Sequence, residues 1–424
     1  MHEEGMIYSN LRDVYPERKR NMQKPLKECE LLAPAGDAEA LEAALFYGAD
    51  AVYLGGPRLQ LRAKRAGFGE EELIRAVTRI HEHNKKAYIA VNSYAYNEEI
   101  DAVPAYARFL KEAGADGVIV SDLGVIAQIR ESEPELEVHV STQANCQNWR
   151  SAQVYCSMGV KRIVLAREMN LDQIRQLRDR IPDDVTIEAF VHGAMCVAYS
   201  GRCILSSWLT GRSGNRGACA QPCRWNYVLS EETQPGEYFP VFEDGQGTEI
   251  LSSHDIRMIA HLQELADAGV TSFKIEGRMK TAYYVATVVN AYRRAMDGTM
   301  DPELCLAETE CVKHRPYETG FYYDHLREGH ANDAVDTFDC TFAAKVLGRE
   351  DGMLVIQQRS PFFVGDVLEL IPRAGEGITK IPVTELINKD GEHQSGAPHP
   401  MQELRLPCDI PAEAGEFLRK RVCV

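Results

Sequence analysis

The sequence predicts an α/β protein: a (β/α)8 TIM-like barrel followed by a small β-barrel domain. Between residues 30 and 300, short apolar runs rich in β-branched residues alternate with segments of helical period, which is typical of buried parallel strands joined by crossover helices. Eight such units in about 270 residues match the usual size of this barrel. After Val335 the pattern changes to short strands separated by turns rich in Gly, Pro and Asp, which favours a small β-barrel. An open doubly wound sheet is the alternative arrangement of the first eight units.

The helix after the first strand has the start and stop signals expected of these units, because Asp37 precedes it and Gly48 follows it. The starts of successive strands lie mostly 20 to 35 residues apart, but 86 residues separate Thr186 from Ser272. We therefore expect an insertion after strand seven, and because loops that follow barrel strands lie on the active face, it should lie over the mouth of the barrel. The predicted strands are residues 30–35, 51–55, 87–92, 117–121, 137–142, 162–167, 186–192 and 272–276.

The chain divides into four predicted parts. Residues 1–29 form a polar extension that is basic through Arg18, Lys19, Arg20, Lys24 and Lys27. Residues 30–300 form the barrel, residues 301–334 a linker, and residues 335–424 the small β-barrel domain. Its clearest strands are expected at 342–347, 354–358 and 367–371.

Composition limits the possible partners and the compartment. Lys and Arg total 47 against 63 Asp and Glu, so the net charge of −16 disfavours polyanion binding over the whole surface, and any contact with nucleic acid must be local. The first residues, Met1-His2-Glu3-Glu4, are acidic where a signal peptide needs a basic start, and no apolar run approaches the roughly 18 residues of a spanning helix. We expect a cytoplasmic protein.

Four of the twelve cysteines, Cys196, Cys203, Cys219 and Cys223, fall within 28 residues of the insertion. Gathered thiolates suit a tetrahedral zinc or an iron–sulfur cluster, because soft sulfur ligands select those centres. Cys219 and Cys223 have the close spacing of a zinc knuckle, but Cys196 and Cys203 are seven apart, which favours the cluster. An isolated cysteine would more often be a small buried apolar residue.

Two acid-free stretches give the acidic chain local positive charge. Residues 192–225 hold four arginines and no Asp or Glu, and residues 57–69, after strand two, hold Arg58, Arg62, Lys64 and Arg65. On a barrel both stretches occupy the same face, so this mouth would attract a carboxylate or a phosphate. The alternative is that the arginines balance the thiolates and pair with helix carboxylates.

Polar side chains at strand ends supply the candidate substrate-binding residues. A barrel places catalytic and binding groups at the carboxyl ends of its strands. Motifs of serine hydrolases, of His-Glu-x-x-His metalloproteases and of phosphate loops are absent, so no catalytic residue is assigned. For a lone histidine such as His192 a structural role is the simpler alternative. The candidates are Arg62, Asn92, Gln143, Arg167, His192, Glu276 and Arg278.

The run from Glu188 to Ser206, EAFVHGAMCVAYSGRCILS, resembles the signature of the collagenase-like peptidase U32 family. The resemblance is strong over about residues 30–300, and the β-rich tail is similar to the family's C-terminal domain more loosely. Further matching blocks are residues 32–36, 51–56, 139–143, 216–224, 252–255 and 274–278.

This resemblance implies a function that the residues alone do not reveal. The better understood members are oxygen-independent hydroxylation proteins with a [4Fe-4S] cluster on four cysteines, which implies Cys196, Cys203, Cys219 and Cys223 as the ligands. The branch that this chain most resembles acts with prephenate, converting the wobble uridine in the anticodon region of tRNA to 5-hydroxyuridine. Other branches hydroxylate the ubiquinone ring or ribosomal RNA. Prephenate is a small carboxylate, so Arg62, Arg167 and Arg278 are the first candidates to bind it.

Two other functions remain possible at this point. A U32-type peptidase, a collagenase-like hydrolase, is implied by the family name, although the sequence shows no nucleophile–base pair. A zinc-stapled scaffold would need only the four cysteines.

Overall fold

The structure is a computed structural model, and it describes residues 24–61, 66–196, 198–225, 243–244, 247–248, 254–323, 337–371 and 377–422. The predicted basic extension therefore lies outside the described residues as far as residue 23. No helix among the described residues is long and apolar enough to cross a membrane.

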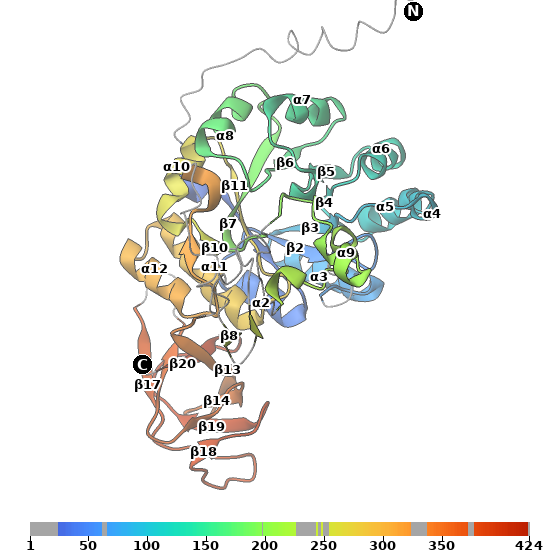
Figure 1. The fold of residues 1–424 in the computed structure, drawn as a ribbon. Helices are drawn as coiled ribbons and strands as arrows, with labels where there is room; N and C mark the ends of the chain where they lie inside the picture. The colour runs from blue at the N-terminus through green and yellow to red at the C-terminus, as the bar shows by residue number, and fades with distance from the viewer. Residues whose placement is uncertain are drawn as a thin grey trace, which may run out of the picture. The chain divides into compact units, whose positions relative to one another are not determined.

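Eight parallel strands close into a barrel (Figure 1). Each strand pairs with the next, and the ring closes where β11 pairs with both β1 and β7. The predicted fold class is confirmed, and the open doubly wound alternative is excluded because an open sheet has no such closing pair. The barrel strands are β1 (Glu30–Pro34), β2 (Ala51–Gly55), β3 (Lys86–Val91), β4 (Gly117–Val120), β5 (Glu137–Val140), β6 (Arg162–Val164), β7 (Thr186–Ala194) and β11 (Ser272–Ile275).

Local capping explains where several barrel helices begin. The Asp122 carboxylate accepts hydrogen bonds from the main chain at the start of α6, and Asn148 caps α7 in the same way. Asn170 and Gln173 form a capping box at the start of α8. The helices between β2 and β7 are α3 (Glu70–Glu82), α4 (Asn97–Ile100), α5 (Val103–Glu112), α6 (Leu123–Ser132), α7 (Trp149–Ser157) and α8 (Leu171–Arg178).

The long step between β7 and β11 is an insertion, as predicted. It begins with the cysteine-bearing residues and the short helix α9 (Leu205–Thr210). A short strand, β10 (Asp255–Arg257), then runs antiparallel to the end of β7, and β12 (Tyr317–Glu318) pairs with β10. The helix α10 (Leu262–Asp267) leads back to the last barrel strand. The sheet is thus extended beside the carboxyl end of β7.

The amino-terminal end of the barrel interior is filled by buried charges. Arg162 on β6 contacts Glu30 at 2.5 Å and Glu188 at 3.0 Å, and Lys274 on β11 donates to Glu188 at 2.7 Å. The Tyr88 hydroxyl donates to Glu30 at 2.8 Å. Because each charge meets an opposite charge at hydrogen-bond distance, this network satisfies the groups that close the floor of the barrel.

A second compact unit joins three helices to the C-terminal strands. Its antiparallel sheet has six strands in the order β17-β16-β20-β13-β14-β19, curled by bulges in β13. Arg419 on β20 is fully buried and pairs with Glu308 and Glu369 at 2.6 and 3.0 Å. The predicted small β domain is present, whereas the boundaries at residues 29, 300 and 334 stay predictions. The elements are α2 (Ala38–Phe46), α11 (Ala282–Asp297), α12 (Pro302–Glu310), β13 (Cys340–Glu350), β14 (Met353–Gln358), β15 (Phe362–Phe363), β16 (Val367–Leu370), β17 (Thr379–Pro382), β18 (Gly396–Ala397), β19 (Glu403–Pro407) and β20 (Phe417–Arg421).

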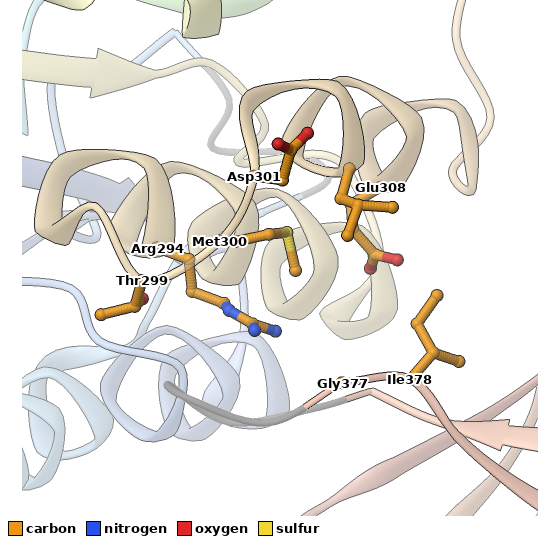
Figure 2. Close-up of a pocket in the computed structure, with 8 residues that line it drawn as sticks. Arg294, Thr299, Met300, Asp301, Glu308, Gly377 and Ile378 are labelled. Atoms are coloured by element: carbon orange, nitrogen blue, oxygen red, sulfur yellow. The ribbon is translucent and has the colours of Figure 1, made fainter.

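Figure 2 shows a pocket of about 210 Å³ within this second unit. Residues from the end of α11, from α12 and from the turn before β17 line it, among them Arg294, Leu304 and Ile378. None of the predicted site residues lies in this pocket; those that the structure describes lie at or just after the carboxyl ends of barrel strands.

Candidate substrate site at the barrel mouth

The cysteine segment, residues 195–225, is fastened to the loops that follow four barrel strands. The Arg216 guanidinium makes a bidentate ion pair with Glu99, at 2.9 and 3.0 Å, and lies 3.6 Å from the ring centroid of Tyr96. The Ser200 main-chain N–H and hydroxyl both donate to Glu168, at 2.7 and 3.2 Å. These loops all lie on the active face of a barrel. The expectation that the insertion lies at the mouth is confirmed.

Two glycines permit the closest approaches of this segment to the barrel. A Cβ at Gly201 would collide with the main-chain oxygen of Gln143, and one at Gly217 would come within 2.8 Å of the main chain of Leu61. Both glycines also have positive φ, at +71° and +80°, which other residues rarely adopt. The segment therefore needs glycine at these positions for two independent reasons.

Beneath the segment, three predicted residues meet around two aromatic rings. Arg167, after β6, lies 4.0 Å from the ring centroid of Phe190 and 3.7 Å from the Glu276 carboxylate. Arg278, after β11, is 6% exposed, and its guanidinium lies 5.6 Å from the ring centroid of Tyr53. These two arginines and the Glu276 carboxylate are all largely shielded from water.

The ion pair inside this cluster is a loose one. The separation between Arg167 and Glu276 is longer than a hydrogen bond, and the Arg167 Nε is buried with no hydrogen-bond partner in the described part of the chain. The second arginine is held by Gln60, whose Oε1 accepts from Arg278 at 3.1 Å. Burial raises the pKa of the Tyr53 phenol well above its usual value, so this ring stays neutral. The mouth suits a carboxylate, which both guanidinium groups could bind in bidentate fashion.

His192 lies at the same end of the barrel with partners that sequence reasoning missed. Its Nε2 is 3.3 Å from the Tyr317 hydroxyl, and Tyr317 belongs to the extra strand β12. Nearby, the buried Arg315 donates to the Asp255 carboxylate at 2.7 and 2.9 Å. Nothing in the local sequence around residue 192 pointed to Tyr317, because the two residues are 125 positions apart.

The remaining predicted residues support the loops of the mouth. The Asn92 Oδ1 accepts from the Leu61 N–H at 3.3 Å, and the Gln143 main-chain oxygen accepts from the Tyr94 hydroxyl at 2.9 Å. Arg62 lies outside the described residues. The structure thus brings Arg167, Glu276 and Arg278 together and gives the other described candidates separate positions on the same face.

The four cysteines lie on the segment that covers this mouth, with Cys196 exposed and the other three half-buried. Among the residues that the structure describes, no three His, Cys, Asp or Glu side chains stand close enough together to hold a metal ion. The donor chemistry nevertheless fits a thiolate-ligated cluster, because the segment carries four thiols and no carboxylate. The Gln221 N–H donates to the Cys219 sulfur at 3.3 Å, which is the kind of hydrogen bond that sulfur ligands receive. Binding would have to draw the four sulfurs together.

Sequence reasoning also missed the buried charges of the barrel floor. Burial lowers the pKa of Lys274, and the neighbouring Glu188 carboxylate opposes that effect. A signal was present, since both residues interrupt apolar runs in the middle of strands that are buried on both faces. A charge at such a position must be paired, which points to a partner across the barrel.

The fold and the mouth together define a class: a (β/α)8 barrel whose carboxyl-terminal face carries a cysteine-bearing insertion over buried arginines. The chain belongs to peptidase family U32, because the profile of that family matches residues 36–332 and the profile of its C-terminal domain matches residues 339–419. The family predicted from the signature run is therefore confirmed.

Three relatives illustrate the range of names in the family. The chain is 36% identical to tRNA hydroxylation protein P1 of Bacillus subtilis over 409 residues, which cover 93% of this chain and 95% of the relative. It is 38% identical to the 23S rRNA 5-hydroxycytidine C2501 synthase of Escherichia coli, over 64% of this chain and 40% of that protein. It is 37% identical to a collagenase of Porphyromonas gingivalis, over 66% of this chain and 69% of that protein.

Proposed function

We propose that this protein hydroxylates a pyrimidine base of RNA, and specifically that it converts the wobble uridine of tRNA to 5-hydroxyuridine with prephenate as co-substrate and an iron–sulfur cluster as cofactor. The observation that carries this proposal is the relationship, along almost the whole chain, to a protein named for tRNA hydroxylation. A second relative is named for hydroxylation of a cytidine in ribosomal RNA. Both names refer to hydroxylation of an RNA.

The mouth supports the proposal because its arginines suit the binding of carboxylates. Prephenate carries two carboxylates, and Arg167 and Arg278 are two largely buried guanidinium groups on the active face. In a site that excludes water, a bidentate arginine–carboxylate pair is stronger and more directional than it is at the surface. Glu276 holds Arg167 only at 3.7 Å, so a ligand carboxylate competes with a weak partner. Arg62 is a third candidate for this role.

The cysteine segment supports the proposal through its ligands and its position. Cys196, Cys203, Cys219 and Cys223 would hold a [4Fe-4S] cluster, which exchanges single electrons when it is bound. Arg202, Arg212 and Arg216 on the same segment offset the negative charge of four thiolates. Because Ser200 and Arg216 fasten the segment to the barrel loops, a cluster bound there would stand at the mouth.

The target base must leave its stack to reach a mouth of this kind. A wobble base lies in a single-stranded loop, so it can be turned outward at less cost than a base in a duplex. This requirement favours an anticodon loop over a helical stem as the substrate.

The decisive experiment is nucleoside mass spectrometry of tRNA and ribosomal RNA from cells that lack the protein. We expect 5-hydroxyuridine to disappear from tRNA and to return with the wild-type gene but not with Cys→Ala variants at positions 196, 203, 219 or 223. Unchanged 5-hydroxyuridine with loss of a hydroxylated nucleoside from ribosomal RNA would move the proposal to that RNA. No change in either RNA would contradict it.

The cofactor has its own test, which does not depend on activity. Anaerobically purified protein should be brown and contain iron and sulfide, and each of the four Cys→Ala variants should lose the visible absorbance. Colourless protein with one zinc per chain would favour the zinc-stapled scaffold instead.

A peptidase function is the second candidate, supported by the family description and by the relative named collagenase. It predicts release of peptides from gelatin by the purified protein. Hydrolysis that survives in the Arg167→Ala variant but not after removal of the cysteines would place peptidase chemistry on the segment, whereas no hydrolysis by the wild type removes this candidate.

A further inference from the structure

We infer that the outer side of the cysteine segment is a stacking platform for unpaired RNA bases, formed by Tyr199, Trp208 and Trp225 together with Arg202 and Arg212. We call these five residues the aromatic platform. The inference rests on the proposed function, because it names the surface by which the RNA of that reaction is held.

The platform exposes an unusual amount of aromatic surface. Trp208 is 80% exposed, Tyr199 62% and Trp225 41%, and the apolar Ile204 beside them is 66% exposed. Two of the three tryptophans in the chain therefore lie on this segment with a large part of the ring in water. Exposed aromatic surface that is gathered in one segment marks a binding surface, because leaving it in water is unfavourable.

The short elements of the segment bring the two tryptophans into one neighbourhood. Trp208 lies on α9, which packs against the turn formed by Pro222–Arg224, and Trp225 follows that turn directly. The Trp225 Nε1 donates to the Ala220 main-chain oxygen at 3.2 Å, which fixes the indole while part of it stays exposed. Tyr199 precedes Ser200, the residue fastened to Glu168 at the rim of the mouth. The platform thus begins at the mouth.

Charge makes this surface suitable for RNA in a chain that otherwise repels it. The whole chain has a net charge of −16, yet residues 192–225 contain no Asp or Glu. Arg202 and Arg212 are exposed there, and the Arg212 Nε donates to the Ala218 main-chain oxygen at 3.1 Å. This stretch therefore places phosphate-attracting charge beside the exposed rings.

The combination of rings and arginines without acids favours RNA over a protein partner. Single-stranded nucleic acid is held by aromatic side chains that stack on bases and by cations that follow the backbone. The cores of protein interfaces are depleted of charge, whereas here two arginines alternate with the rings. A loop stacked on this platform would bring one of its bases to the mouth beside Tyr199.

Fluorescence anisotropy with two labelled probes tests the platform. The first probe is an RNA hairpin with a pyrimidine-rich loop, and the second is a continuous RNA duplex of similar length. The Trp208→Ala and Tyr199→Ala variants should bind the hairpin about fivefold or more weakly and the duplex unchanged, since each stacked base contributes about 1–3 kcal/mol. Trp208→Phe should keep most of the affinity because it keeps an aromatic face. Phe363→Ala, which removes a ring that is 50% exposed on β15, is the matched control and should bind like the wild type.

Arg202→Ala separates the charged part from the stacking part. It should lower the affinity for both probes and reduce the slope of log affinity against log salt by about one, whereas Trp208→Ala leaves that slope unchanged. Thermal unfolding and visible absorbance of every variant establish that the fold and any cluster are intact.

The inference is overturned if Trp208→Ala and Tyr199→Ala bind the hairpin as tightly as the wild type, or if Phe363→Ala weakens binding equally. It is also overturned if Trp208→Ala keeps its RNA affinity and loses a protein that copurifies with the wild type. The proposed function is judged separately, by restoring the wild-type gene to cells that lack the protein. If that gene restores no hydroxylated nucleoside while Trp208→Ala weakens hairpin binding, the platform stands and the proposed function fails.

Discussion

The two ends of the barrel carry the same residue types in opposite states. At the floor, Arg162 lies between Glu30 and Glu188 with contacts of 2.5 and 3.0 Å, and Lys274 adds a third pair at 2.7 Å. At the mouth, Arg167 lies 3.7 Å from the Glu276 carboxylate, and its guanidinium packs over the Phe190 ring. The charges of the floor meet at hydrogen-bond distance, whereas Arg167 at the mouth meets its carboxylate partner at a longer distance.

This difference indicates what each end does. A buried ion pair adds little to stability over apolar residues, but removing one partner is costly because the other charge stays behind. The floor should therefore govern folding. A loosely paired buried arginine contributes less to folding and more to recognition of an anion. The mouth should therefore govern binding.

The largest expected effect is the loss of stability in Arg162→Met. It leaves Glu30 and Glu188 buried without their shared partner, which should lower the free energy of unfolding by about 3–5 kcal/mol. Urea unfolding followed by circular dichroism measures the loss. Arg167→Met at the mouth is the matched variant, and its free energy of unfolding should fall by about 1 kcal/mol or less. Equal losses in the two variants would contradict the view that the floor governs folding and the mouth does not.

The next effect sharpens the mouth. Titration calorimetry of prephenate into the wild type and into Arg62→Ala, Arg167→Ala and Arg278→Ala should show binding weakened by about 2–5 kcal/mol for the variants that line the site. Arg175→Ala on the outer surface of α8, where the side chain is 46% exposed, is the control and should not change the affinity. If the wild type does not bind prephenate, or if all three mouth variants bind it as tightly as the wild type, these arginines only balance charge.

The third effect is the acid sensitivity of the floor. Burial raises the pKa of the Glu30 carboxyl, but Arg162 and the hydrogen bonds from Ser272 and Tyr88 outweigh it and lower the pKa from 4.5 to about 2. The stability contributed by this lowered pKa is fully present above pH 4.5 and is lost as the pH falls towards 2, with a total of about 3 kcal/mol. Unfolding measured between pH 6 and pH 3 should therefore show a smaller decline in Glu30→Gln than in the wild type. Parallel declines would contradict the assignment.

The smallest effect concerns the attachment of the cysteine segment. Arg216→Ala removes the ion pair with Glu99 and the contact with Tyr96, which should cost about 1 kcal/mol or less because the pair is partly exposed. Hydrogen exchange should nevertheless become faster in the segment than elsewhere. Arg108→Ala, which removes the ion pair of a more exposed arginine with Glu133, should leave exchange in the segment unchanged.

Much of the architecture could be predicted from the sequence because it depends on local periodicity. The eight apolar runs become the eight barrel strands with ends that differ by a few residues, and the 86-residue step becomes the insertion at the mouth. The four cysteines and the acid-free stretch are local features too, so the sequence placed them on one segment. Strand period and loop length contain this information directly.

The tertiary structure alone decided which charges face one another. Closure of the ring brings Glu30 to Arg162 across 132 positions, and the extra strand β12 brings Tyr317 to His192. Alternation along a strand tells which residues point inward, but the layer that each one occupies depends on the stagger between neighbouring strands and on where the ring closes. For this reason Arg167 and Glu276 could be named from their positions at strand ends. The long distance of their ion pair, and the short distances between the charges of the floor, became visible only in the folded barrel.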